Sequence, residues 1–375
     1  MTLRLLTTQV GDVQNKADMR TKYNTFFEAL SQKVELAGHY DASLRGAARY
    51  WNAARSFCLS WRRWKERSFR NVPAFRTRSE ACVRYIRQMQ PSPGVVLQLG
   101  VLFDSTWADS PVPVVLYTDN TSAITARHPT AGRHAFNASE QADWMALEKE
   151  CYQRVQHICV RAAVVQRSLE TDYDVPTGKI SVIGGGVNYS PMPRLPELNL
   201  AQAPTALFVG RDFHRKGGDL VLKAFARARP SCPDARLLVV TGRRIPAGLP
   251  LDGVEQVRIG WDREALASLY RRADLFILPS RQETWGDVLL EAMAYGLPCI
   301  GVTGQAMEEI IQPGVTGELV PPEDVHALAG ALTSLLVDRA LRIRIGQAAR
   351  ARVEMQFSWE QVVERLLPIL IEARR

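Results

Sequence analysis

Apolar residues in the second half of the chain form short continuous runs separated by segments of helical periodicity. The runs are TALFVG (205–210), ARLLVVTG, LFILPS and PCIGV, and the segments between them carry apolar residues three and four positions apart. Such runs predict buried strands, and the intervening segments predict helices. Strand–helix repeats with short loops indicate a doubly wound parallel sheet covered on both faces. Only helices are expected at the end of the chain, over 325–336, 339–356 and 358–374.

The first half of the chain has a less regular pattern. Apolar runs predict strands over 3–8, 95–103 and 112–119, and the runs ICVRAAVVQ and KISVIGGG complete a strand–helix alternation. Asn137 is followed three residues later by Glu140, which predicts a capping box at the start of a helix. This half is therefore also expected to be an α/β domain.

The segment from about Tyr23 to Gln90 is expected to be helical and is rich in aromatic residues and arginines. Its apolar side chains recur at steps of four, three, four and three, at Tyr50, Ala54, Phe57, Trp61 and Trp64. The other faces carry Arg55, Arg62, Arg63, Lys65, Arg67 and Arg70. Such a stripe either packs on the N-terminal sheet or lies on an anionic membrane with its arginines at the lipid headgroups.

Three consecutive glycines, 184–186, and a group of prolines interrupt every periodic pattern for about twenty residues. A stretch of this kind is typical of a domain boundary. We therefore expect an N-terminal domain over 1–188 and a C-terminal domain over 189–357. The chain of 375 residues has the length for two domains of roughly 150–200 residues each.

The amino-acid composition limits which binding partners the protein can have and which cellular compartment it can occupy. No apolar run reaches the roughly 18–20 residues that span a bilayer. Six scattered cysteines form no Cys-x-x-Cys pair, which predicts a reducing compartment and no structural zinc. The net charge of +8 favours an anionic partner: a nucleotide, a nucleic acid or a membrane surface. Aromatic residues beside arginines suit single-stranded nucleic acid, but here they share a helical stripe, so nucleic acid is the remote alternative.

The segment GRDFHRKGG, residues 210–218, directly follows a predicted strand and precedes a helix. Ligands of doubly wound sheets bind beyond the carboxyl ends of the strands, so this loop is a candidate site. Arg211 offers a planar fork and Lys216 a point charge, while Gly217 and Gly218 allow close approach of the backbone. This combination suits a diphosphate, and the plainer interpretation is a solvated basic turn.

The segment SRQETWGDVLLEAMAYGLPCI, residues 280–300, places two glutamates eight positions apart. Glu283 lies in the loop after a predicted strand, whereas Glu291 lies inside the following helix, which is apolar almost all round. A carboxylate in a buried helix needs hydrogen-bond partners. A sugar diol would supply them, and the alternative is a core arginine, Arg271 or Arg272.

These motifs together resemble the retaining GT-B glycosyltransferases of family four. The shared pattern is Glu-x7-Glu followed by AMAxGxP, with GR-x4-KG some seventy residues upstream, and the likeness is strong over 205–320. The resemblance implies two Rossmann-like α/β domains facing across a cleft, with the C-terminal helix, 358–375, returning to the N-terminal domain. No cofactor is expected. The lack of an Asp-x-Asp motif at a strand end agrees with catalysis without a metal.

The family's functional residues carry over to matching positions of this sequence. The resemblance implies that Arg211 and Lys216 hold the donor diphosphate and that Glu291 binds the donor ribose. It places Glu283 against the donor sugar, where a carboxylate stabilises the transition state. Backbone N–H groups at a helix start also suit phosphate or sugar oxygens. The donor-binding residues therefore also include Thr284, Trp285 and Gly286.

The N-terminal half departs from the family pattern. Where the family often has a glycine pair after its first strand, this chain offers only Gly11, which we keep as a candidate donor contact. Where the family often has a histidine after a strand, this chain has Thr118 and Asp119. Asp119 either takes over the histidine's contact as a catalytic residue or caps a helix or turn. His128 is expected to be structural.

The sequence is therefore expected to encode a glycosyltransferase that uses a nucleotide-sugar donor and retains the anomeric configuration. A UDP-sugar is favoured over a GDP-sugar, and the acceptor is a glycan, a lipid-linked molecule or a small molecule. The alternative is a GT-B relative such as a nucleotide-sugar epimerase or a disaccharide synthase. We expect a cytoplasmic protein, attached peripherally to the inner face of a membrane if the aromatic stripe is exposed.

Overall fold

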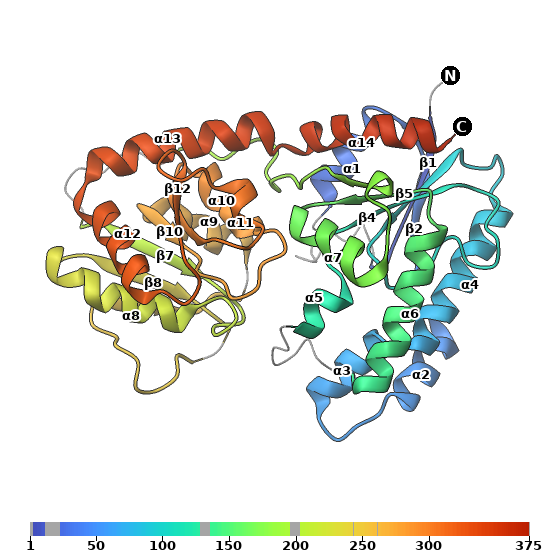
Figure 1. Ribbon diagram of the computed structural model, residues 1–375, viewed down its shortest axis with the longest axis horizontal. Coiled ribbons are helices and arrows are strands. Elements are labelled where there is room, and N and C mark those ends of the chain that lie inside the picture. Colours follow the sequence, from blue (N-terminus) through green and yellow to red (C-terminus); the bar gives the residue numbers. More distant parts are fainter. Residues whose placement is uncertain are drawn as a thin grey trace. The chain divides into compact units, whose positions relative to one another are not determined.

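The computed structural model describes residues 3–11, 23–127, 136–195, 203–242, 244–260 and 262–374. The chain divides into two compact units, Met1–Gly184 with Val362–Arg375, and Gly185–Gln361. Each unit is built on a six-stranded sheet in which all neighbouring strands run parallel (Figure 1). The expected pair of doubly wound α/β domains, the GT-B architecture, is therefore confirmed.

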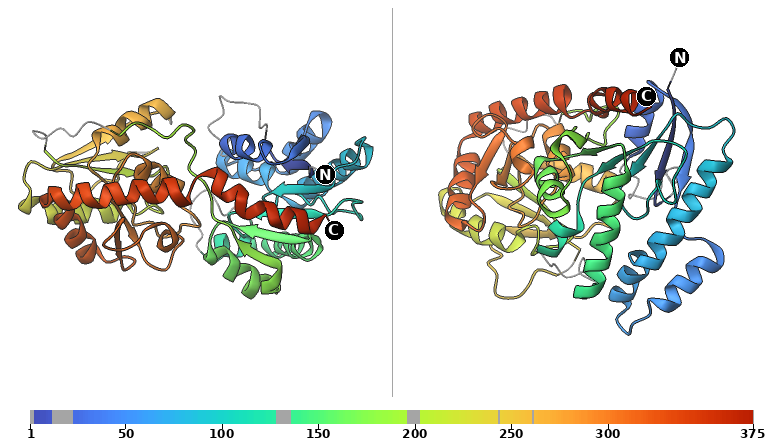
Figure 2. Two further views of the ribbon diagram at one scale, coloured as in Figure 1. Left: turned by 90° about the horizontal axis from the view of Figure 1, so that it is seen from above. Right: turned by 45° about the vertical axis from the view of Figure 1, so that its right-hand side comes forward.

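The sheet of the N-terminal unit has the strand order β2-β1-β3-β4-β5-β6. Its strands are β1 (Arg4–Gln9), β2 (Glu35–Asp41), β3 (Val95–Leu99), β4 (Val114–Thr118), β5 (His157–Val160) and β6 (Ile180–Val182). The helices are α1 (Asn24–Ser31), α2 (Gly46–Arg55), α3 (Trp61–Phe69), α4 (Val72–Gln88), α5 (Ser122–Arg127), α6 (Ala138–Arg154) and α7 (Ala163–Tyr173). Helices cover both faces of this sheet, as the blue and green ribbons in the left view of Figure 2 show.

The central strands and the helices over them form the core of this unit. Every residue of β3 and β4 is buried, as expected for a parallel sheet covered on both faces. Trp144 on α6 packs edge-on against Phe75 on α4. The capping box of α6 is confirmed, because Asn137 accepts from the Glu140 amide and the Glu140 side chain accepts from the Asn137 amide.

The expected helical region over 23–90 is wrong in two respects. It contains the edge strand β2, and its helical stripe is not one continuous face, because α2 ends at Arg55 and α3 begins at Trp61. The Ser60 side chain caps α3 by accepting from the Arg63 amide. Most of the aromatic side chains of the stripe are exposed rather than packed on the sheet.

The sheet of the C-terminal unit has the strand order β12-β11-β10-β7-β8-β9. Its strands are β7 (Thr205–Val209), β8 (Arg236–Val240), β9 (Val254–Val257), β10 (Leu275–Ile277), β11 (Cys299–Val302) and β12 (Gly317–Val320). The helices are α8 (Gly218–Ala228), α9 (Arg263–Arg272), α10 (Asp287–Ala294), α11 (Met307–Ile310), α12 (Val325–Val337) and α13 (Arg339–Gln356). Strands and helices alternate as the sequence predicts, except that β9 follows β8 with no helix in the described residues between them. The apolar runs did not predict β9 and β12, the short strands at the two edges of the sheet.

The final helix, α14 (Trp359–Ala373), belongs from Val362 onward to the N-terminal unit, as expected. One stripe of the helix is fully buried there, formed by Val362, Val363, Leu366 and Leu370. Arg365 Nε donates to the carbonyl of Ile183 at 2.8 Å. Among the residues that the structure describes, no helix is both long and apolar enough to cross a membrane.

Candidate functional site

Two of the predicted site residues meet at the carboxyl ends of β7 and β10, which are neighbours in the C-terminal sheet. Lys216 lies in the loop between β7 and α8, and Glu283 lies in the loop between β10 and α10. The Lys216 ammonium and the Glu283 carboxylate form an ion pair, with only 14% and 11% of the two side chains exposed. Parallel strands bring the two loops to one sheet edge, although 67 residues separate the partners.

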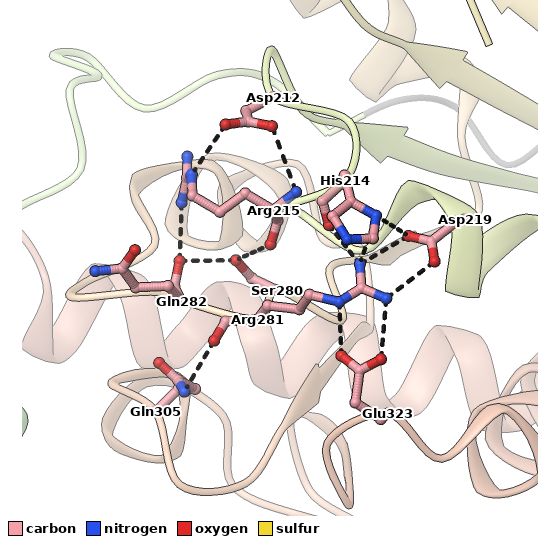
Figure 3. A network of polar contacts seen from close by, with 9 residues as sticks. All are labelled: Asp212, His214, Arg215, Asp219, Ser280, Arg281, Gln282, Gln305 and Glu323. Carbon is pink, nitrogen blue, oxygen red and sulfur yellow. Dashed lines mark hydrogen bonds and ion pairs between the residues drawn. The ribbon is translucent and has the colours of Figure 1, made fainter. Parts of the chain in front are cut away.

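The backbone of the Glu283 loop is held by side chains from other elements and from the loop itself (Figure 3). The Gln282 carbonyl accepts from Arg215 Nη1 at 2.8 Å and from Ser280 Oγ at 2.9 Å. The Glu283 amide donates to Gln305 Oε1 at 2.9 Å, and the Glu283 carbonyl accepts from the Ala306 amide. Hydrogen bonds therefore hold both the amide and the carbonyl of Glu283, as well as the carbonyl of the preceding residue.

Arg281 ties the same loop to two other elements (Figure 3). Its guanidinium donates two hydrogen bonds to the Asp219 carboxylate on α8, at 2.7 and 2.9 Å. It also reaches Glu323, after β12, with Nη2 2.9 Å from Oε2. Burial alone would raise the pKa of Asp219, but the hydrogen bonds and charge of Arg281 outweigh it and lower that pKa. The arginine therefore acts as a clamp between α8 and the Glu283 loop.

Glycines allow the backbone of both loops to pass close to other elements. Gly217 has φ +77°, and a Cβ there would lie 2.1 Å from the Pro279 carbonyl oxygen. Gly286 has φ +115° and directly precedes α10. Any other residue would be strained at both positions. Gly217 therefore permits the tight approach of the Lys216 loop to the Glu283 loop, and Gly286 permits the turn into α10.

Trp285 and Thr284 lie between Glu283 and the start of α10. Trp285 is buried and packs against Phe357, with ring centroids 5.9 Å apart. Its indole N–H has no hydrogen-bond partner among the described residues. Thr284 is half-buried. Trp285 therefore anchors the loop in the core.

Glu291 lies on α10 and accepts a hydrogen bond from the Tyr270 hydroxyl at 3.0 Å. Burial, followed by the charge of Asp287, raises the pKa of Glu291 to about 7, and the Tyr270 hydrogen bond and Arg263 oppose this rise. The alternative of a core arginine partner is wrong. Arg271 pairs with Glu264, and Arg272 lies 3.9 Å from Glu255.

Arg211 lies just beyond β7 and is exposed. Its side chain passes Gly242, after β8, where an added Cβ would meet Arg211 Cγ at 3.4 Å. Arg211 and Lys216 thus belong to one loop. Of these two cations, Lys216 forms the ion pair with Glu283.

Two further predicted residues lie in the N-terminal unit, each just beyond the carboxyl end of a strand. Gly11 follows β1 with φ +117°, and its amide donates to Asp41 Oδ1 at 2.9 Å. Asp119 directly follows β4 and is half-buried. His128 lies outside the described residues.

Sequence reasoning did not identify Arg281, Arg215, Gln305 and Tyr270. Arg281 stands two residues before Glu283, but its acidic partners are 62 and 42 residues away. Tyr270 is 21 residues from Glu291 and on a different helix. The sequence offers no signal that pairs residues across such separations.

One family profile and several known proteins are similar to this chain. The profile of "Glycosyl transferases group 1" matches residues 196–352. A glycogen synthase of Mycobacterium tuberculosis is 27% identical over 262 residues, which are 64% of this chain and 62% of that enzyme. A "GDP-mannose-dependent monoacylated alpha-(1-6)-phosphatidylinositol monomannoside mannosyltransferase" of Corynebacterium glutamicum is 35% identical over 168 residues, 42% of this chain and 44% of that enzyme. The chain thus matches less than two thirds of the length of either relative.

The fold is also shared with solved structures. Sucrose-phosphate synthase from Thermosynechococcus elongatus superposes with a TM-score of 0.72, covering 99% of this chain and 98% of that one, at 21% identity. At this identity the likeness establishes the fold alone.

Proposed function

We propose that the chain transfers a sugar from a nucleotide-sugar donor to an acceptor, because residues 196–352 match the profile of glycosyl transferases group 1. The observation that carries the proposal is the Lys216–Glu283 pair. The two groups lie together on a fixed backbone at the sheet edge where ligands of doubly wound sheets bind.

The pair has the charges that glycosyl transfer requires. Breaking the bond from anomeric carbon to phosphate leaves negative charge on the diphosphate and positive charge on the sugar. Lys216, with Arg211 from the same loop, is proposed to hold the diphosphate, where fixed cations lower the barrier. A bound diphosphate would compete with Glu283 for the ammonium, which frees the Glu283 carboxylate to face the developing positive charge.

Glu291 is proposed to bind the ribose of the donor. A carboxylate accepts hydrogen bonds from two neighbouring hydroxyls, and Tyr270 holds one of its oxygens in place. Burial raises the pKa of Glu291, and a carboxylate with a shifted pKa is a candidate for a functional group. The half-buried Thr284 and the amides at Trp285 and Gly286 are proposed to complete the donor contacts.

We further propose transfer with retention of configuration, without a metal, and with a UDP-sugar favoured over a GDP-sugar. Asp119 and Gly11 are proposed to serve the sugar or the acceptor from the N-terminal unit. A nucleotide-sugar epimerase or disaccharide synthase is the second candidate, since the same donor residues would serve it.

Six unpaired cysteines, four of them buried, support a reducing, cytoplasmic location. A glycan, lipid-linked or small-molecule acceptor fits this location. We also propose peripheral attachment to the inner face of a membrane, because aromatic side chains of α2 and α3 are exposed beside arginines.

A donor screen tests the proposal. Nucleotide release is measured with UDP-, GDP- and ADP-sugars, each with and without a metal chelator, for the wild-type protein and for Lys216→Ala. We expect release from one donor class, insensitive to the chelator and strongly reduced in the variant. Nuclear magnetic resonance of the product then reports the anomeric configuration. Interconversion of the donor sugar without nucleotide release would favour the epimerase, and no turnover of any donor by the wild type contradicts the proposal.

A further inference from the structure

Helices α2 and α3 and the loop between them expose an unusual amount of apolar surface. The exposed fractions are 76% for Tyr50, 71% for Trp51, 66% for Phe57, 98% for Leu59 and 69% for Trp61. These five residues, which we call the aromatic surface, lie within twelve positions of the sequence, from 50 to 61. Large contiguous apolar patches are rare on proteins that stay monomeric in water and mark sites of contact with a partner or a membrane.

The aromatic surface is built on a defined helical pair. The Trp64 indole N–H on α3 donates to the Ala53 carbonyl on α2 at 2.7 Å, and Asn52 Nδ2 donates to the Ser68 carbonyl at 2.5 Å. The Trp64 ring contacts Trp61 edge-on, with centroids 5.0 Å apart, and Phe57 at 5.9 Å. The half-buried Trp64 thus contacts two of the exposed rings, Trp61 and Phe57, and its hydrogen bond to Ala53 joins α3 to α2.

The pair of helices lies at one end of the N-terminal unit, on the opposite side of that unit from α14 (Figures 1 and 2). Asn52 is the one buried residue of α2. Most residues of α2 are exposed, and its large apolar side chains, Tyr50 and Trp51, lie outside the core of the unit.

Positive charge surrounds the aromatic surface. Residues 46–69 contain six arginines and lysines and one carboxylate, Glu66. Four of the cations, Arg49, Arg55, Arg63 and Lys65, are exposed, and none of the four forms an ion pair in the described part of the chain. This end of the unit therefore presents aromatic rings together with unneutralised cations.

We propose that the aromatic surface docks on the anionic face of a lipid bilayer. Tryptophan and tyrosine favour the membrane–water interface, because their rings are apolar and their N–H or O–H groups are polar. Arginines and lysines beside them attract anionic headgroups, each by about fivefold in affinity near the surface. A helix with both features lies in the plane of the interface.

A second copy of the chain fits this surface less well. A two-fold contact would bring the same patch of each copy together, so the cations Arg49, Arg55 and Arg63 would face their own equivalents. Anionic lipid, in contrast, satisfies the aromatic and the cationic side chains at once. The proposal names the contact through which the membrane attachment proposed above occurs, and it does not depend on the sugar-transfer activity.

Flotation with lipid vesicles tests the proposal without any sugar donor. We expect the full chain to float with vesicles containing anionic phosphatidylglycerol at low salt, and to float much less with pure phosphatidylcholine. Charge reversal at Arg55→Glu and Arg63→Glu together should lower the affinity by at least about 25-fold. The matched control is Lys223→Glu with Arg227→Glu, two exposed cations on α8 of the C-terminal unit, which should bind as the wild type does.

Brominated lipids test whether the rings enter the interface. They should quench part of the tryptophan fluorescence of the wild type, and Trp51→Phe and Trp61→Phe should each reduce the quenched fraction. Both side chains are exposed, so the melting temperature should stay unchanged and report that the variants fold.

Three results would overturn the proposal. The first is a wild type that does not float with anionic vesicles. The second is a wild type that self-associates and becomes monomeric on Trp61→Asp, which assigns the surface to a second copy. The third is equal binding of the charge-reversed variant and the control variant to anionic vesicles. Vesicle binding by a protein that turns over no donor would support the docking surface while contradicting the transferase.

Discussion

At the scale of single residues, Lys216 and Glu283 neutralise one another in a largely buried position. If Lys216 holds the donor diphosphate, Lys216→Ala removes that cation and leaves Glu283 without its partner. We expect a loss of about 2 kcal/mol or more of transition-state stabilisation, roughly 30-fold in kcat/KM. Steady-state kinetics with the best donor measure this. Lys223→Ala, an exposed lysine on α8, is the control and should keep the wild-type rate, and a Lys216→Ala rate near wild type would remove the main support for the site.

Glu291 should determine the affinity for the nucleotide, and Glu283 should determine the rate of transfer. Glu291→Ala leaves ribose hydroxyls without an acceptor, which typically costs about 1–3 kcal/mol, so it should weaken binding of UDP or GDP. Glu283→Ala should not weaken nucleotide binding, because Glu283 competes with the diphosphate for Lys216, and it should slow turnover. Calorimetry with the bare nucleotide compares the variants, with Tyr270→Phe as a control that removes the hydroxyl contacts to Glu291 and to the Val288 carbonyl. An equal loss of affinity in Glu283→Ala and Glu291→Ala would show that the roles are misassigned.

The raised pKa of Glu291 makes a prediction about stability and pH. Its folded pKa, about 7, exceeds the ordinary value of 4.5, so the folded protein holds a proton that the unfolded chain releases. Stability from this group is present below about pH 4.5 and is lost as the pH rises through 7. Glu291→Gln lacks this titration. The melting temperature of the variant relative to the wild type should therefore increase between pH 5 and about 8, by the equivalent of roughly 1–2 kcal/mol, since the side chain is only partly buried. A difference that is constant with pH would contradict the raised pKa.

At the scale of elements, the Glu283 loop depends on contacts from α8, the β11–α11 loop and the segment after β12. Arg281 supplies two of them, and its two acidic partners differ in burial, with 15% of the Asp219 side chain exposed and 56% of that of Glu323. Asp219→Asn should destabilise the C-terminal unit by about 1.5–3 kcal/mol, because it weakens a buried hydrogen-bonded charge pair. Glu323→Gln should cost about 1 kcal/mol or less, since exposed pairs contribute little. Thermal unfolding of the two variants measures the difference, and equal effects would show that Arg281 does not act through Asp219.

The apolar spacing in the region of α2 and α3 did not reveal that two separate helices are present. A step of three and four continues from Tyr50 to Trp64 across the break between the helices, because the intervening loop happens to preserve the spacing. The cap at Ser60 and the helix start at Asn71 with Pro73 in the first turn are local signals of separate helices. Strand β2 was missed because it is an edge strand paired only with β1, so its half-exposed residues form no continuous apolar run.

At the scale of the whole molecule, the last helix links the end of the chain to the N-terminal unit. Leu366 on α14 is fully buried there, whereas Ile371 on the same helix is 44% exposed. Leu366→Ala should destabilise the N-terminal unit by about 2–5 kcal/mol, and Ile371→Ala should cost well under half of that. Deletion of 358–375 should have a larger effect than either. Limited proteolysis shows which unit becomes sensitive, and digestion of the C-terminal unit first would contradict the assignment.

The sequence by itself determined the α/β architecture, because apolar runs alternating with helical periodicity are local and leave few arrangements that bury them. It also predicted Lys216, Glu283 and Glu291 as site residues, since spaced motifs are read along the chain. Only the tertiary structure decided that Lys216 pairs with Glu283, that Tyr270 and not an arginine faces Glu291, and that Arg281 clamps the loop. These contacts join residues up to 67 positions apart, and a local pattern holds no information on which distant side chains share one sheet edge. Whether an apolar helix face is buried or exposed was likewise decided by the tertiary structure, which leaves 71% of Trp51 and 69% of Trp61 exposed.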